Sequence, residues 1–209
     1  GEGEAPNANR REGKAMAEQP RGRAEKTILF DVSKREIFTH SHGLKTLRRK
    51  LQSGYKMAAN KDTLTLDRMR EASLVLFVGP REKFSGAEFE AMKAYLQEGG
   101  SIFVTLGEGG ESAFNTNVNY LLEEFGIMCN TDAIVRTVYY KYTHPKEVHI
   151  AGGVLNREID HAAGKGPAST GSGTTPAITE SSPQSSIAFA YPYGASLSVQ
   201  KPAFPALSS

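Results

Sequence analysis

The chain has 209 residues, enough for one domain of ordinary size, and 39% hydrophobic residues with 9% aromatic residues permit a packed core. A formal net charge of +2 is too small to indicate a nucleic-acid partner by itself, and the single cysteine, Cys129, excludes an internal disulfide. No apolar stretch approaches the roughly 20 residues that span a bilayer, and the N-terminal residues contain no signal-peptide core. We therefore expect a soluble, intracellular protein with no nucleic-acid partner and no membrane insertion.

Residues 1–25 have almost no large apolar side chain, and their many charges nearly cancel. Such a segment cannot bury enough surface to offset the entropy lost on ordering. We predict a disordered tail over 1–25, followed by an α/β domain over 26–162.

The domain alternates strand and helix patterns. The strand patterns are the short apolar runs "TILFDV", "YKMAAN", "SLVLFVG" and "SIFVTL". Leu44, Leu47 and Leu51 are spaced to share one face of a helix between the first two runs. Strands alternating with helices are typical of right-handed crossovers and a parallel sheet. The pattern predicts a doubly wound, mostly parallel sheet with helices on both faces.

A second helix is expected to begin near residue 85. Ser85 and Glu88 have the spacing of a capping box, and Phe84 and Phe89 flank them as a hydrophobic staple. The helix is expected to bury Phe89, Met92 and Leu96 and to end at Gly99 and Gly100.

A third helix is expected after Asn115, which is a suitable N-cap residue. Its apolar stripe consists of Val118, Leu121, Leu122 and Phe125, and Gly126 closes it. The stretches "IMCN" and "AIVRTVYYKY" are the next strand candidates.

Residues 163–186 are mostly Gly, Ser, Thr, Pro and Ala, which predicts a flexible low-complexity loop. Residues 187–209 contain the strand-like run "IAFAYPYGASLSV" and are assigned to the same domain. Because no helix follows this run, we expect a fragment of a longer protein, truncated at the C-terminal side of its α/β domain.

Ligands of open parallel sheets lie beyond the carboxyl ends of the strands. The residues placed there form a candidate ligand crevice: Asp31, Arg81, Gly107, Glu108, Gly109, Gly110 and Glu111.

The stretch "GEGGES" at 107–112 has alternative interpretations. It matches neither phosphate-loop motif, and Glu108 and Glu111 would repel an anion. The two carboxylates could instead bind sugar hydroxyls, act as an acid/base pair or hold a hard cation. The favoured interpretation is a sharp turn that needs glycine, with the acids in water or near a helix N-terminus.

No group of residues assembles a nucleophile, a base and an oxyanion donor. Cys129 lies at the start of a strand pattern, as expected for a buried inert thiol. The five histidines are scattered and form no metal motif with it. We predict no catalytic residue, no metal and no cofactor.

A basic stretch on the first helix is the candidate partner-binding surface. It consists of Lys45, Arg48, Arg49 and Lys50, with no acid between Glu36 and Asp62. The ordinary interpretation is a solvated helix face, and the alternative is a contact with an acidic partner.

Several long stretches resemble one known family. "TILFD", "KREIFT", "GPREKFSGAEFEAMKAYLQEGG", "LGEGGESAFNTNVNYLLEEFGIMCNTDAIVRTVYYKYTHPKE" and "GVLNREI" are similar to the N-terminal domain of the intraflagellar transport protein 52 family. The resemblance implies the Rossmann-like domain shared by intraflagellar transport and bacterial gliding-motility transport proteins. It also implies a core subunit of intraflagellar transport complex B with no catalysis.

The resemblance therefore predicts a non-catalytic scaffold that supports cilium assembly and cargo transport along ciliary microtubules. Its expected partners are other complex B subunits, its expected location is the cilium or flagellum, basal body and cytoplasm, and the domain itself is expected to be monomeric. The alternative is a module that binds a small, sugar-like ligand in the crevice.

Overall fold

The computed structural model describes residues 27–138, 141, 143–156, 159, 162 and 187–208. The expected disordered tail over 1–25 and the expected flexible loop over 163–186 lie outside the described residues.

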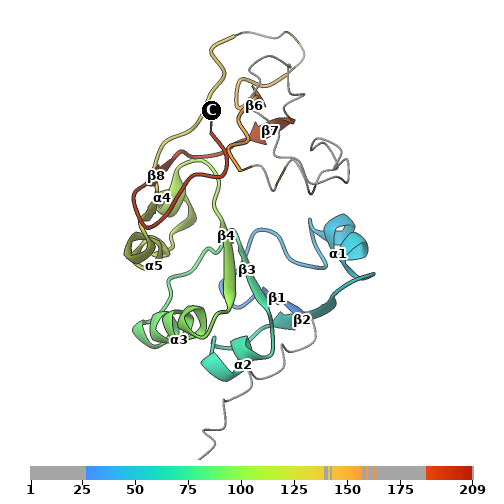
Figure 1. The fold of residues 1–209 in the computed structure, drawn as a ribbon, viewed down its shortest axis with the longest axis vertical. Helices are drawn as coiled ribbons and strands as arrows, with labels where there is room; N and C mark the ends of the chain where they lie inside the picture. The colour runs from blue at the N-terminus through green and yellow to red at the C-terminus, as the bar shows by residue number, and fades with distance from the viewer. Residues whose placement is uncertain are drawn as a thin grey trace, which may run out of the picture.

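A four-stranded parallel sheet forms the centre of the domain, in the order β2-β1-β3-β4 (Figure 1). The strands are β1 (Thr27–Asp31), β2 (Lys56–Asn60), β3 (Leu74–Val78) and β4 (Ser101–Thr105). They coincide with the four apolar runs, so the predicted parallel α/β sheet is confirmed. Because β1 lies between β2 and β3, the chain winds outward from β1 in both directions.

Helices cover both faces of this sheet. In β1, Ile28 and Phe30 face α1 (Lys45–Leu51), where Leu44 and Leu51 pack on them. Leu29 points the other way, into the cluster formed with α2 (Leu66–Arg70) and α3 (Gly86–Gln97). Alternate side chains of a strand face opposite sides, which explains why all five residues of β1 are buried.

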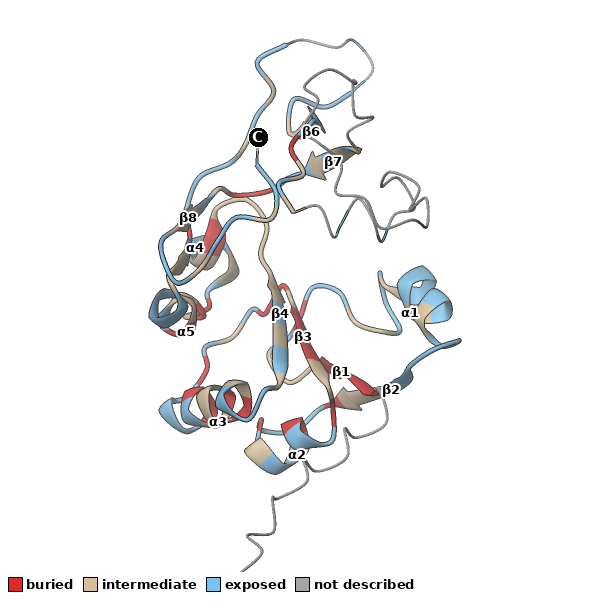
Figure 2. Ribbon diagram, viewed as in Figure 1, coloured by how far each residue is buried: buried red, intermediate tan, exposed pale blue. Residues whose placement is uncertain are grey.

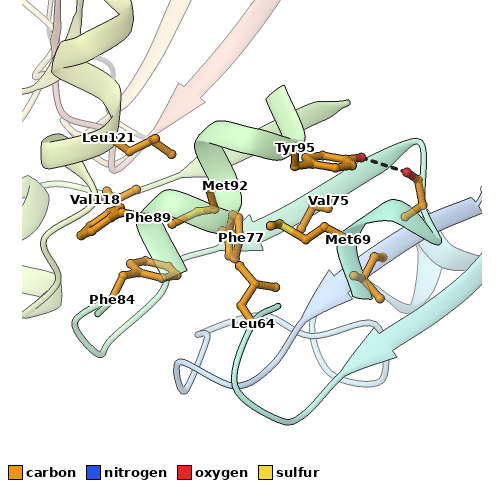
Figure 3. Packing of buried hydrophobic residues seen from close by; sticks show 12 residues of the cluster. Leu64, Met69, Val75, Phe77, Phe84, Phe89, Met92, Tyr95, Val118 and Leu121 are labelled. Carbon is orange, nitrogen blue, oxygen red and sulfur yellow. Dashed lines mark hydrogen bonds between the residues drawn. The ribbon is translucent and has the colours of Figure 1, made fainter. Parts of the chain in front are cut away.

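The larger core lies between the sheet and the helices α2 and α3 (Figure 3). Phe77 of β3 meets Phe84 edge to face, with ring centroids 5.3 Å apart. The sequence stripe of α3 identified Phe89 and Met92 correctly but included Leu96 in place of Tyr95, which is only 3% exposed. The Tyr95 hydroxyl donates to the carbonyl of Ala72, 2.9 Å away, so a tyrosine can be buried there.

The segment after β4 differs from the sequence expectation. It forms α4 (Gly110–Phe114), α5 (Asn119–Leu122) and a 3-10 turn, η1 (Glu123–Phe125). Asn115 does not begin a helix: it ends α4 in the left-handed conformation, with φ of 53°. Val118 and Leu121 are buried as expected, whereas Phe125 is 38% exposed because the short helices turn it away from the core.

Two antiparallel pairs lie beside the parallel sheet (Figure 1). β5 (Ile127–Cys129) pairs with β8 (Leu197–Val199), and β6 (Glu147–Ala151) pairs with β7 (Ala188–Pro192). β6 was not predicted. The prediction of a strand over "AIVRTVYYKY" is wrong for residues 133–138. Ile134 and Arg136 donate their backbone N–H groups to two separate loops rather than to one partner strand. Tyr139, Tyr140 and Tyr142 lie outside the described residues.

The start of α3 is fixed by the predicted capping box. The Glu88 carboxylate accepts from the backbone N–H of Ser85 at 2.8 Å, and the Ser85 hydroxyl oxygen accepts from the backbone N–H of Glu88 at 3.3 Å. Glu88 is only 2% exposed, and the Lys34 ammonium binds it at 2.7 Å. Burial by itself would raise the pKa of Glu88, but the hydrogen bonds from Lys34, Ser85 and Leu64 outweigh it, and the pKa is lowered.

We expect Glu88→Ala to lower the free energy of unfolding by about 3–5 kcal/mol, because it leaves the largely buried Lys34 ammonium without its partner. The loss should be largest near neutral pH. It should shrink as the pH falls through the lowered pKa of Glu88, because the wild type then loses the carboxylate as well. Urea unfolding of the wild type and of Glu88→Ala, from neutral to acidic pH, measures this difference in the free energy of unfolding.

The matched control is Glu90→Ala, since the Glu90 side chain is 75% exposed on the same helix. Its expected cost is below about 1 kcal/mol. Equal losses for the two variants would contradict a special role for Glu88.

Candidate functional site

A buried carboxyl pair lies where β1 ends. Asp31 is 2% exposed and accepts from the amide of Asn60 at 2.7 Å and from the hydroxyl of Ser33 at 2.8 Å. Glu36 is 7% exposed, and one of its oxygens accepts from the backbone N–H of Lys34 at 3.1 Å. The other oxygen, Oε1, is buried without a protein donor.

The two carboxyl groups interact, so they cannot both be ionised at low cost. Burial raises the pKa of Glu36 to about 8, and the hydrogen bond and negative charge of Asp31 add to this rise. With a pKa of about 8, Glu36 is mostly uncharged at neutral pH. The pair holds the loop after β1, whose Ile37 donates its N–H to Gly79 at the end of β3.

The loop 107–111 uses its own carboxylates inside the protein. Glu108 pairs with Lys146 at 2.5 Å. Glu111 accepts from the backbone N–H of Asn119, the first residue of α5, at 2.5 Å. An acid at a helix N-terminus is the position that the turn interpretation predicted for it.

The backbone of the same loop joins the parallel sheet to the antiparallel pairs. Glu108 donates its N–H to the carbonyl of Tyr193, and Gly109 donates to that of Asp132, both at 2.8 Å. Gly110 has φ of 50°, and a Cβ there would lie 2.3 Å from the carbonyl oxygen of Asn130. The loop therefore needs glycine for a close approach to the segment after β5.

Space beyond the ends of β3 and β4 is filled by a side chain of the protein. A Cβ added at Gly79 or at Gly107 would lie 3.1 Å from the ring of Phe114. The side chain of Ile37 also lies close, with its Cβ 3.3 Å from the position of a Cβ at Gly79. The ring of Phe114 thus lies between the strand ends where the sequence placed a ligand crevice.

The predicted crevice residues are divided among different surroundings. Asp31 is buried with Glu36 and Asn60, and residues 107–111 contact the antiparallel segments. Arg81 is exposed, and its backbone N–H donates to the carbonyl of Lys34. Sequence reasoning missed Glu36 and Asn60, because nothing local distinguishes a buried polar residue in a loop from an exposed one.

Two cavities of about 380 Å³ each are lined by none of the predicted crevice residues. One is polar and lies at the end of β2, beside Asn60 and Asp62. The other is apolar and lies between β4 and the β5–β8 pair, beside Val104 and Cys129. A ligand role for the crevice residues stays a prediction.

Cys129 is buried, as the sequence indicated. Burial raises the pKa of its thiol, and the charges of Asp132 and Glu111 raise it further. An activated thiol nucleophile requires the opposite shift, because the thiolate is the reactive form.

Within the part of the chain that the structure describes, no three or more His, Cys, Asp or Glu residues gather as a metal site. No helix of the described ranges is long and apolar enough to cross a membrane.

The carboxyl pair predicts a dependence of stability on pH. Since the pKa of Glu36 is raised to about 8, the native state binds its proton more tightly than the unfolded chain. Stability should therefore fall as the pH rises from about 4.5 to about 8, by up to about 1.4 kcal/mol per pH unit.

In Glu36→Gln the amide donates to Asp31 at every pH, so this fall should disappear and the variant should exceed the wild type at pH 8 by at least about 1.4 kcal/mol. Urea unfolding between pH 5 and pH 8 measures the difference. Glu123→Gln, at an exposed position, should follow the wild type. A Glu36→Gln profile parallel to that of the wild type would refute the assignment.

The close approach at Gly110 predicts that Gly110→Ala costs more than about 2 kcal/mol, since the left-handed backbone alone costs roughly 1–2 kcal/mol for alanine. Gly86→Ala is the control, because its Cβ would meet nothing within 4 Å and its φ is not positive. It should leave the midpoint of unfolding unchanged or raised. If both variants unfolded at the wild-type midpoint, the loop would not be constrained as described.

Comparison with known proteins identifies the family. The family model for the IFT52 GIFT domain matches residues 27–209. The chain is 51% identical over 187 residues to the intraflagellar transport protein 52 homolog of Homo sapiens, covering 88% of this chain and 41% of that protein. It is 50% identical over 183 residues to the Mus musculus homolog, covering 88% of this chain and 42% of that one.

A solved structure, that of the mmIFT52 N-terminal domain, is similar in fold, with a TM-score of 0.75 and 50% sequence identity. The similarity covers 88% of this chain and 72% of the solved one. The chain thus spans about two fifths of the length of the two full-length relatives. It belongs to the IFT52 GIFT domain family, which confirms the resemblance seen in the sequence.

Proposed function

We propose that this chain is a non-catalytic scaffold domain of a core subunit of intraflagellar transport complex B. The observation that carries the proposal is its 51% identity, over 88% of the chain, to an intraflagellar transport protein 52 homolog. In this role it supports cilium assembly and the transport of cargo along ciliary microtubules. Its partners are other complex B subunits, and it acts in the cilium or flagellum, the basal body and the cytoplasm.

The geometry of the described residues supports a structural role. Glu108 and Glu111 each bind a group of the protein itself, and the raised pKa of Cys129 disfavours its nucleophilic form. Phe114 lies between the strand ends where related folds place their ligands. Groups that resembled a reactive or ligand-binding loop in the sequence thus hold the fold together.

The alternative, a module for a small sugar-like ligand, has less support because a ligand at the strand ends would have to displace Phe114. A screen of monosaccharides by NMR distinguishes the two. Saturable shifts at Asp31, Arg81 and Glu108 would favour the ligand module, and their absence would favour the scaffold.

The scaffold proposal predicts the behaviour of the full-length protein in ciliated cells that lack their own copy. A protein without residues 27–208 should restore cilia poorly and should bring down fewer complex B subunits. Glu108→Gln with Glu111→Gln should restore cilia to near the wild-type length, because each glutamine keeps an acceptor oxygen in place.

Cilium length and co-precipitation of complex B subunits are the measurements. A doubly substituted protein that unfolds at the wild-type temperature and yet builds no cilia would indicate chemistry at the loop instead. A wild-type protein that brings down no complex B subunit would refute membership of the complex.

A further inference from the structure

The outer side of α1 carries a group of cations that the fold does not use. We define the basic α1 surface as Lys45, Leu47, Arg48, Arg49 and Lys50. No residue of this seven-residue helix is buried, and Figure 2 draws most of it in the colour of exposed residues. Leu44 and Leu51 hold the helix against the sheet, so the surface is presented from a fixed base.

Counter-charges are absent from this region. Residues 37–61 contain six Lys or Arg and no Asp or Glu. Within the described part of the chain, no cation of the basic α1 surface forms an ion pair, whereas cations elsewhere do so: Lys34 binds Glu88 at 2.7 Å and Lys93 binds Glu124 at 2.6 Å. Four described cations without an ion pair, Lys45, Arg48, Arg49 and Lys50, therefore lie together on one seven-residue helix.

Exposed apolar side chains occur on this helix and on the segments that flank it in the chain. Leu47 is 42% exposed, although the sequence pattern placed it on the buried stripe with Leu44 and Leu51. Phe38 and Tyr55, on the segments just before and after the helix, are 48% and 43% exposed. A surface with apolar side chains between cations offers a partner desolvated contacts as well as attraction.

The segment that follows this region in the chain has the opposite net charge. Residues 62–124 contain eleven Asp or Glu against five Lys or Arg. This segment includes α2 and α3, which cover the face of the sheet opposite α1 (Figure 1). The domain is therefore electrically polarised, and an acidic partner would be attracted to α1 and repelled by the other face.

We propose that the basic α1 surface docks an acidic segment of another subunit of the transport complex, with an apolar side chain of that segment against Leu47. This inference rests on the proposed function. A protein segment fits better than a nucleic acid, because the exposed apolar side chains find no match in a phosphate backbone. The acidic face would also repel an extended polyanion.

The test uses the full-length protein and the purified complex B subunits, with affinities measured one subunit at a time. Arg49→Glu with Lys50→Glu should weaken the binding of one subunit roughly tenfold or more, since several exposed charge contacts of about 0.2–1 kcal/mol are reversed. The matched variant is Lys83→Glu with Lys201→Glu, which changes net charge equally at two exposed positions away from α1. It should change the affinity less than about twofold.

Three further measurements complete the test. Raising the salt concentration should weaken wild-type binding more than binding by the α1 variant. Cross-linking of the wild-type complex should locate the acidic segment of that subunit, and reversing its acidic residues should restore binding to the α1 variant. Leu47→Ala should weaken binding while leaving its salt dependence unchanged, because it removes only the apolar contact.

Distinct outcomes would overturn the inference. Equal losses for the two double variants would show only a long-range charge effect. Wild-type binding to a 20-base-pair DNA duplex as tight as to any subunit would indicate a nucleic-acid surface. Self-association removed by the α1 variant, with no subunit affected, would identify a second copy as the occupant. If every subunit bound the α1 variant normally, the proposed function would stand and this docking site would fall.

Discussion

The arrangement of the parallel sheet and its helices depends on one buried carboxylate, that of Glu88. It binds the Lys34 ammonium, the backbone N–H of Ser85 and the backbone N–H of Leu64. These groups belong to the loops that leave β1, β3 and β2 respectively. Because the three strands are parallel, their exit loops meet at the same edge of the sheet. A single carboxylate with several acceptor positions can bind all three loops. Its negative charge offsets the desolvation cost of burying the Lys34 ammonium.

The sequence predicted the elements whose signals are local. Four apolar runs became four parallel strands, and the capping box at Ser85 and Glu88 began a helix, because neither depends on distant contacts. The errors lie where tertiary contacts decide. Leu96 was chosen over Tyr95 because helical spacing cannot show that the carbonyl of Ala72 is in reach of the tyrosine hydroxyl. The strand β6 depends on pairing with β7, about 40 residues further along the chain, which periodicity does not contain.

The candidate site shows the same division. The sequence located the strand-end loops and gave a physical reason to doubt phosphate binding at Glu108 and Glu111. It could not show that Lys146 would bind Glu108, or that the N-terminus of α5 would bind Glu111. It also could not assign Glu36 to Asp31, because the four loop residues between them leave the fold free to bury either, both or neither. The buried pair and the ring of Phe114 occupy the ends of β1, β3 and β4 with groups of the protein itself.

A domain whose polar groups are engaged inside the fold can still act through charges that remain outside it. The fold uses its acids where they stabilise structure, at Glu88 and Glu111, and pairs many of its cations with neighbouring carboxylates. The cations of α1 are different, since no acid lies near them in the sequence and the helix packs on the sheet through Leu44 and Leu51. Placing unpaired like charges side by side opposes folding slightly, and the position of Arg48, Arg49 and Lys50 at the carbonyl end of the helix offsets part of this repulsion. Contact with an acidic partner would add attraction at the same cations, so this surface is the part of the domain best suited to assembly.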